Sequence, residues 1–314
     1  MTAQKKQIAI GVDVGGSHIS CKSYDLNNKK LVKDSLKSME INNGGSADEI
    51  VTSFIQLLQP CLSEMAKEEI AGIGLAMPGP FDYKNGIAMF SGENAKYSLL
   101  NGVDMRKALA TRLGIEENKI RFINDATAFA IGEYFNGQLQ GAEKALAITL
   151  GTGFGSAFLW DGKPVISDNT VPEGGVLWNE PFADGIADDY FSTRGLISRF
   201  SDQSGVVVEG VKPIAELYNT NSHSKDVFDD FGTQLAVLLS PWLKRFDVEN
   251  LVIGGNISKA FSLFEGSFIT ELDKEGIKIK VAPSILLEDA AFVGAASLMN
   301  DQFYNSIEEQ LEQM

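Results

Sequence analysis

The stretch that decides the fold is IAIGVDVGGSHISCKSYDL, residues Ile8 to Leu26. Two runs of alternating apolar residues flank the pair Gly15–Gly16, a pattern that predicts two antiparallel strands joined by a tight turn. Glycine-rich loops that bind phosphate usually lead into a helix, whereas a second strand follows here. The backbone N–H groups of such a turn can still point at a phosphate, because glycine tolerates the required dihedral angles.

Asp13 interrupts the first of these strands, two residues before Gly15. A carboxylate in a buried strand is unfavourable unless it is paired or hydrated. Mg²⁺ binds proteins through one or two carboxylates together with substrate phosphates, so a hydrated ion would satisfy Asp13. The alternative is a hydrogen bond from the neighbouring turn amides. We expect Asp13 to face Mg²⁺ through water.

The middle of the chain repeats the beginning. ALAITLGTGFGSAFLWDGK, residues Ala145 to Lys163, again predicts strand, glycine turn and strand, now around Gly151-Thr152-Gly153. The repetition favours two similarly built halves, although two hairpins can also resemble each other by chance. A third glycine pair, Gly254–Gly255, follows the buried strand VENLVIG and opens into a helix.

Asp125 ends the predicted strand KIRFIN and starts the small-residue helix DATAFAIGEYFNG. An N-cap role would by itself explain an aspartate there. The functional alternative is a general base that takes the proton of a hydroxyl group attacking phosphorus. The adjacent Asn124 is suited to hydrogen-bonding hydroxyl groups.

Strands alternate with helices along the 314 residues, which predicts an α/β fold with mixed sheets and two domains. The net charge of −15, without a clustered Lys/Arg stretch, argues against nucleic acid or an anionic membrane as partner. The N-terminus MTAQKKQ lacks the apolar core of a signal peptide, and no apolar run approaches the ~20 residues that span a bilayer. We therefore expect a soluble, cytoplasmic protein.

Two cysteines, Cys21 and Cys61, and two histidines, His18 and His223, are present in the whole sequence. There is no CxxC pair for a zinc or thioredoxin-type centre, and no G-x-S-x-G elbow accompanies either histidine. The P-loop and G-x-G-x-x-G motifs are also absent. We expect the cysteines to be buried apolar side chains, His18 to lie in the region where the turn meets the strand, and His223 to lie in a solvated loop.

Five motifs together resemble the ROK family of bacterial sugar kinases and repressors, within the actin/Hsp70/sugar-kinase superfamily. They are DVGGSHI for the first phosphate motif, PGPFD for the sugar-domain loop, INDATAFAIGE for the catalytic segment, LGTGFGSAF for the second phosphate motif and LVIGGNIS for the adenosine side. The resemblance runs from Ile8 to Met299, nearly the whole chain.

The resemblance implies a two-domain actin-like ATPase (ribonuclease H-like) fold. Each domain would be a mixed sheet flanked by helices, with the ligand cleft between domains of residues 1–122 plus 292–314 and residues 123–291. Asp125 would be the general base, and Asp13 would face the Mg²⁺ of MgATP. The other implied contacts are Gly15, Gly16, Ser17, Gly151, Thr152 and Gly153 for the phosphates, Gly254 and Gly255 for the adenosine, and Asn94, Asn124 and Glu173 for the sugar hydroxyls.

The chain departs from the family pattern in one segment. Many members carry a Gly-His pair and a cysteine cluster that binds structural zinc, whereas this chain has Val176 at the histidine position and no cysteine there. No structural zinc is therefore expected. Asp188 stands where many relatives have a glutamate near the second carbon of the sugar, and we expect it to be a substitute contact.

The implied activity is ATP-dependent phosphorylation of a hexose, glucose or a close derivative. The alternatives are a kinase for an N-acetylhexosamine, fructose or another polyol, and a non-catalytic sugar or nucleotide sensor. Retention of Asp13 and Asp125 argues against the sensor. Repressor members carry an N-terminal DNA-binding helix pair, for which the residues before Ile8 leave no room. The family also suggests a homodimer.

Overall fold

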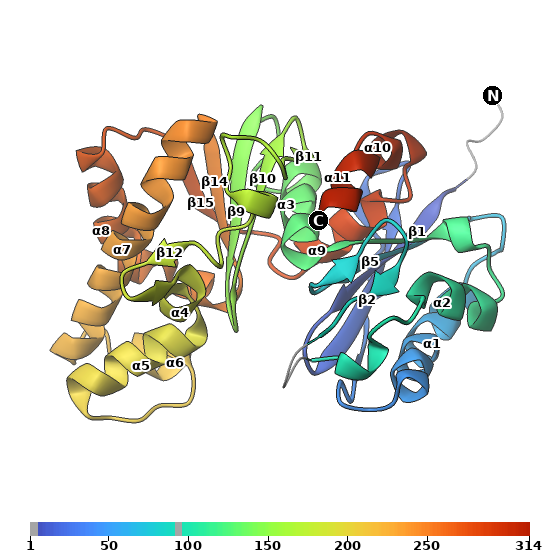
Figure 1. Cartoon of the computed structure of the whole chain (residues 1–314), viewed down its shortest axis with the longest axis horizontal. Coiled ribbons are helices and arrows are strands. Elements are labelled where there is room, and N and C mark those ends of the chain that lie inside the picture. The colour runs from blue at the N-terminus through green and yellow to red at the C-terminus, as the bar shows by residue number, and fades with distance from the viewer. Residues whose placement is uncertain (1–5, 92–95) are drawn as a thin grey trace. The chain divides into compact units, whose positions relative to one another are not determined.

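The computed structural model describes residues 6–91 and 96–314 (Figure 1). Its internal contacts divide the chain into two compact units. The first comprises residues 1–137 and 288–314, and the second comprises residues 138–287.

Helix α3 (Asp125–Asn136) belongs to the first unit because it packs along α9 (Asp289–Ser297). The predicted division began the second domain at residue 123 and cut the chain again at residue 292, inside α9. Both boundaries between the compact units differ from that prediction. The packed helices α3 and α9 belong to the same unit, so the first unit extends to residue 137 and resumes at residue 288.

A six-stranded mixed sheet forms the centre of the first unit, in the order β3-β2-β1-β5-β8 with β4 beside β2. β1 and β2 pair antiparallel around Gly15–Gly16, as predicted, and β5 and β8 continue the sheet parallel to β1. The strands are β1 (Ile8–Val14), β2 (His18–Asp25), β3 (Lys30–Leu31), β4 (Lys37–Glu40), β5 (Ile70–Met77) and β8 (Ile120–Asn124), with a separate pair β6 (Phe81–Asp82) and β7 (Ile87–Ala88). The remaining helices are α1 (Ala47–Ser63), α2 (Met105–Leu113), α10 (Asp301–Asn305) and α11 (Glu308–Gln313).

Helix α9 lies directly on one face of this sheet because the residues beneath it lack bulky side chains. A Cβ atom at Gly11 of β1 or at Gly74 of β5 would overlap the backbone of α9. α3 also approaches α9 closely because a glycine lies at the contact. A Cβ atom at Gly294 of α9 would overlap the carbonyl group of Ala128 in α3. Successive side chains of a strand alternate between its faces, so Asp13 lies on the same face as Gly11 and points toward the α9 side.

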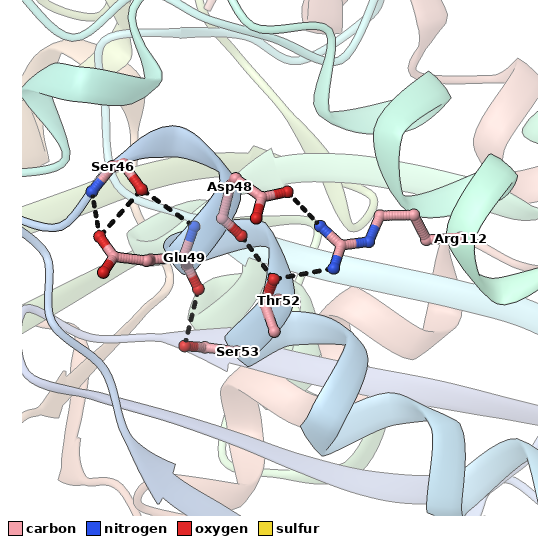
Figure 2. Close-up of polar contacts among 6 residues, drawn as sticks. All are labelled: Ser46, Asp48, Glu49, Thr52, Ser53 and Arg112. Atoms are coloured by element: carbon pink, nitrogen blue, oxygen red, sulfur yellow. Dashed lines mark hydrogen bonds and ion pairs between the residues drawn. The ribbon is translucent and has the colours of Figure 1, made fainter.

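Helices α1 and α2 cover the opposite face of the sheet (Figure 1). Ser46 is the N-cap of α1: the Glu49 N–H donates to Ser46 Oγ (3.3 Å), and the Ser46 N–H donates to the Glu49 carboxylate (2.7 Å). Arg112 of α2 reaches the same turn, where it donates to Asp48 (3.0 Å) and Thr52 (2.8 Å) (Figure 2). The two helices are therefore joined at the start of α1.

The second unit repeats the plan of the first. Its sheet has the order β11-β10-β9-β14-β15, with β9 and β10 antiparallel around the Gly151–Gly153 turn and β14 and β15 parallel to β9. In both units one hairpin is thus extended by two parallel strands, which supports two similarly built halves over chance resemblance. The strands are β9 (Lys144–Leu150), β10 (Phe154–Trp160), β11 (Lys163–Pro164), β14 (Asn250–Gly254) and β15 (Lys280–Pro283), with a separate pair β12 (Pro181–Phe182) and β13 (Gly185–Ile186). The helices are α4 (Ala187–Phe191), α5 (Thr193–Ser204), α6 (Val211–Glu216), α7 (Ser222–Phe246) and α8 (Phe261–Lys274).

Helix α7 starts at Ser222. Asn221 caps it, because its Oδ1 accepts a hydrogen bond from the Ser224 N–H (3.2 Å). His223, expected in a loop, therefore lies exposed in the first turn of α7, and this expectation was wrong. Gly254–Gly255 leads into helical structure as predicted, first a 3₁₀ turn at Asn256–Ala260 and then α8.

The cysteines follow the prediction, since Cys21 and Cys61 are both buried free thiols.

Within residues 6–91 and 96–314, none of the helices combines the length and the apolar character that crossing a membrane requires.

Candidate active site

The carboxyl ends of β1, β5 and β8 meet at one edge of the first sheet, because the three strands run parallel. The register sets Asp13 of β1 opposite Ala76 of β5. Met77, the next residue of β5, lies opposite Asn124, the last residue of β8. The Gly15–Gly16 turn and the start of α3 therefore lie at the same edge, where open α/β sheets commonly bind ligands.

Asn124, and not Asp125, is the N-cap of α3. The Asn124 Oδ1 accepts a hydrogen bond from the Thr127 N–H (3.1 Å). The alternative in which Asp125 serves only as the helix cap is therefore excluded. Asp125 is instead the first helical residue, and its Oδ1 accepts from the Ala126 N–H (2.8 Å) and from Asn124 Nδ2 (3.1 Å). These two donors hold the carboxylate in one orientation at the sheet edge.

The side chain of Asp125 is exposed, so a solute can reach it, yet protein atoms surround it closely enough to weaken its hydration. This desolvation raises the pKa of Asp125, and the hydrogen bonds from Ala126 and Asn124 and the positive charge of Lys96 oppose the rise. A carboxylate with a raised pKa is a better proton acceptor than an ordinary surface aspartate.

Tyr83 contacts Asn124 through its hydroxyl group. Its hydroxyl group donates to the Met77 carbonyl oxygen (3.2 Å) and accepts from Asn124 Nδ2 (3.3 Å). Burial, followed by the charge of Asp125, raises the pKa of Tyr83, so the phenol stays protonated. Asn124 thus has its amide group engaged on the helix, on Asp125 and on Tyr83, and its predicted contact with a sugar hydroxyl stays a prediction.

Asp13 is half-buried on β1, near two further carboxylates. Desolvation, then the negative charges of Asp125 and Glu288, raise its pKa to about 7, and the Val14 backbone N–H opposes the rise. Contact with Mg²⁺ through water and a hydrogen bond with the turn amides therefore both stay predictions for Asp13. Three carboxylates at one edge make this part of the protein favourable for a cation.

The first glycine turn is fixed by its neighbours. The Gly15 N–H donates to the His18 carbonyl oxygen (2.9 Å), and the Tyr97 hydroxyl group donates to the Gly15 carbonyl oxygen (2.5 Å). Asn43 Nδ2 donates to the Gly16 carbonyl oxygen. Ser17 is exposed beside them, with its hydroxyl group 3.0 Å from His18 Nδ1. These hydrogen bonds hold the predicted phosphate-binding turn of the first unit in place.

The second glycine turn is held by α4 and α5 of its own unit. The Gly151 N–H donates to the Gly153 carbonyl oxygen (3.0 Å), and the Thr193 N–H donates to the Gly151 carbonyl oxygen (2.7 Å). The Phe154 N–H, at the end of the turn, donates to the Asp188 carboxylate (2.7 Å). Thr152 at the tip is exposed.

The third glycine pair lies beside the second turn, because β14 runs parallel to β9 with Gly254 opposite Thr149. Gly255 has φ +79°, and a Cβ atom there would overlap the carbonyl group of Leu150. Only glycine fits this position. The predicted phosphate and adenosine residues of the second unit therefore lie together at the carboxyl ends of β9 and β14.

The predicted sugar-binding residues lie in separate segments, whereas the predicted phosphate-binding residues lie together in the glycine turns. Glu173 is exposed at the start of a 3₁₀ turn (Glu173–Gly175). Asp188 is occupied by the Phe154 N–H and lies 3.4 Å from Arg194, so its role as a substitute sugar contact stays a prediction. Asn94 lies outside the described residues.

Five residues of the first unit that sequence reasoning missed contribute to this edge. They are Asn43, Tyr83, Lys96, Tyr97 and Glu288. All five lie in turns or irregular segments, Glu288 just before the start of α9, where no periodicity or glycine pattern marks them. Proximity to the PGPFD motif was the one available signal, and it pointed to Tyr83 alone.

Within the described ranges, no group of three or more His, Cys, Asp or Glu side chains is arranged to hold a metal ion.

Comparison with known proteins assigns the chain to a family. The profile of the ROK family matches residues 9–302. The chain belongs to the ROK family. The two units, each a mixed sheet flanked by helices, form the actin-like α/β fold of ROK sugar kinases. A solved structure, the ROK family glucokinase from Streptomyces griseus in complex with glucose and AMPPNP, has this fold with a TM-score of 0.71 and 20% identity, covering 94% of this chain and 99% of that one.

Two curated relatives match along nearly their whole length. The N-acetyl-D-glucosamine kinase of Photobacterium profundum is 25% identical over 311 residues, which cover 92% of this chain and 98% of the relative. The glucokinase of Thermotoga maritima is 26% identical over 328 residues, which cover 93% and 97% respectively.

Proposed function

We propose that this chain is an ATP-dependent sugar kinase that transfers the γ-phosphoryl group of ATP to a hydroxyl group of a hexose. The observation that carries the proposal is the accessible Asp125 carboxylate, held in one orientation at the sheet edge that also bears the Gly15–Gly16 turn. Its raised pKa supports a role as a general base. Membership of the ROK family and the two kinase relatives support the same activity.

In the proposed reaction, Asp125 accepts the proton of the sugar hydroxyl as the hydroxyl oxygen attacks the γ-phosphorus. A P–O bond to the sugar forms while the bond from the γ-phosphorus to the β,γ-bridging oxygen breaks, and ADP leaves with that electron pair. Reactions of this kind depend on positioning and on stabilisation of the developing charge. Asn124 fixes the orientation of the base, and the backbone N–H groups of the glycine turns bind phosphate oxygens.

Asp13 would hold Mg²⁺ through water ligands. The fit rests on charge, because Asp13 is half-buried near the carboxylates of Asp125 and Glu288, and a divalent cation would relieve their repulsion. Mg²⁺, when bound, neutralises charge on the β- and γ-phosphates.

The glycine turns of the second unit are the other proposed contacts for ATP. Thr152 and Gly153 would present backbone N–H groups, and Thr152 its hydroxyl group, to the phosphates, in a turn that the Gly151 N–H closes and that Thr193 and Asp188 fix. Gly254–Gly255 would lie against the adenosine, where the absence of side chains permits close approach.

The acceptor we propose is a hexose of the glucose type, either glucose or N-acetylglucosamine, the substrates in the names of the two relatives. Glu173 and Asn94 remain the proposed contacts for its hydroxyl groups, with Asn124 and Asp188 as secondary candidates. A kinase that consumes ATP and a free sugar fits the cytoplasm, and a homodimer remains our prediction for its assembly.

The test is ATP-coupled turnover over a panel that contains glucose, N-acetylglucosamine, N-acetylmannosamine and fructose. Asp125→Asn keeps the shape of the side chain but removes the base, and we expect turnover to fall by ~10² or more. Asp104→Asn is the matched control: Asp104 caps α2, where asparagine is an equally good cap, so activity should be unchanged. Equal activity in Asp125→Asn and wild type would refute the role of the base.

A sensor without turnover is the alternative. It would bind AMPPNP and a sugar but phosphorylate none of the panel, and Asp125→Asn would then leave every measured property unchanged.

A further inference from the structure

Lys96 is held beside the first glycine turn by the residue that follows it. Tyr97 is buried with φ +62°, its N–H donates to the Asn43 carbonyl oxygen (3.1 Å) and its hydroxyl group donates to the Gly15 carbonyl oxygen (2.5 Å). These two hydrogen bonds anchor the segment that carries Lys96 to the first glycine turn and to Asn43.

The side chain of Lys96 lies over Gly16. A Cβ atom built on Gly16 would be 2.6 Å from Lys96 Nζ, 2.9 Å from Cε and 3.1 Å from Cδ. Any larger residue at position 16 would displace the ammonium group, so the absence of a side chain there accommodates Lys96 as well as a phosphate.

The ammonium group of Lys96 has no hydrogen bond or ion pair with another residue in the part of the chain that the structure describes. It is nevertheless close enough to the sheet edge for its positive charge to lower the pKa of Asp125. An exposed, unpaired cation between a phosphate-binding turn and the carboxylate that activates the nucleophile is suited to a dianionic group placed between them.

We propose that Lys96 is a phosphoryl-binding residue, whose ammonium group contacts the γ-phosphoryl oxygens of ATP beside Gly16 during transfer. This inference rests on the proposed kinase function, and it adds a side chain to a phosphate site otherwise built from backbone N–H groups. Lys96 offsets the negative charge that Asp13, Asp125 and Glu288 bring to the same edge, which would otherwise repel the phosphate.

The inference is tested with Lys96→Met, Lys96→Arg and the control Lys107→Met, which removes an equally exposed lysine on α2. AMPPNP, which carries a third phosphoryl group, and ADP, which lacks it, are titrated calorimetrically into each protein with Mg²⁺ present. We expect Lys96→Met to weaken AMPPNP binding about 10-fold and ADP binding less than twofold, and Lys96→Arg to retain most of the AMPPNP affinity. Turnover with the best sugar should fall ~10²-fold in Lys96→Met and stay unchanged in Lys107→Met.

Equal weakening of ADP and AMPPNP in Lys96→Met, or no change in AMPPNP affinity and turnover, would overturn the inference. Unchanged ADP affinity in the same variant also shows that the phosphate turn is still folded. If the wild-type protein phosphorylates no sugar, the proposed function fails, and the comparison of AMPPNP with ADP still decides whether Lys96 binds the third phosphoryl group.

Discussion

Replacement of Asp13 by asparagine probes the electrostatics of the sheet edge, because it removes a charge and keeps the shape of the side chain. Burial, then the carboxylates of Asp125 and Glu288, raise the pKa of Asp13 from 3.8 to about 7 in the folded protein. The folded state therefore holds this proton more tightly than the unfolded chain. The stability due to protonated Asp13 is fully present below pH 3.8 and is lost as the pH rises through 7.

The magnitude follows from the pKa difference. Each unit corresponds to about 1.4 kcal/mol, so the wild-type protein would lose ~3 kcal/mol of unfolding free energy between pH 5 and pH 7, and little more above pH 7. Because Asp13 is partly exposed, solvent screening reduces this value to about 1–3 kcal/mol. Asp13→Asn has no carboxyl group to ionise, so its stability relative to wild type should increase by that amount from pH 5 to pH 8.

The assay is urea unfolding of both proteins at pH 5 and pH 8 without Mg²⁺. Asp34→Asn is the matched control, since Asp34 is exposed with φ +56°, a conformation that asparagine also adopts. Its stability relative to wild type should be the same at both pH values. A difference between Asp13→Asn and wild type that is independent of pH, or that shrinks toward pH 8, would refute the raised pKa of Asp13 and with it the repulsion among the three carboxylates.

The remaining predictions concern packing and the second glycine turn. Gly294→Ala should destabilise the protein by about 1–3 kcal/mol in urea unfolding, because the new methyl group overlaps the Ala128 carbonyl, whereas Gly266→Ala in the interior of α8, where the new methyl group meets no atom within 4 Å, should be neutral or stabilising by up to ~1 kcal/mol. Equal effects of the two changes would contradict the close approach of α3 and α9. Asp188→Ala should weaken AMPPNP binding about 10-fold in calorimetry by releasing the Phe154 N–H from the turn, and Asp189→Ala, which removes a neighbouring partner of Arg194, should not. Unchanged affinity in Asp188→Ala would show that the turn keeps its shape without the carboxylate.

The two hairpins could be predicted because their signals are local. Alternating apolar residues set the faces of β1 and β2, and Gly15–Gly16 permits the tight turn between them, as Gly151–Gly153 does between β9 and β10. The start of α1 at Ser46 and the end of α2 at Gly114 (φ +68°) also follow from residues next to each other in sequence.

The role of Asp125 could be predicted only as one of two alternatives. Asn124 and Asp125 are both good N-caps, so the sequence could not decide which residue caps α3. The structure assigns the cap to Asn124 and leaves the Asp125 carboxylate facing the sheet edge. The domain boundaries were also beyond local reasoning, since α3 joins the first unit through its contact with α9, more than 150 residues further along the chain.

The sequence by itself determined the elements: a glycine-turned hairpin at the start of each half, an aspartate at the end of a strand, and helices rich in small residues. Only the tertiary structure decided which charges meet. Asp13, Lys96, Asp125 and Glu288 come from four separate segments, and their interactions exist because parallel β1, β5 and β8 end at one edge beneath the starts of α3 and α9. The pKa of a carboxyl group depends on its burial and on charges nearby in space, so neither quantity can be read from neighbours in sequence.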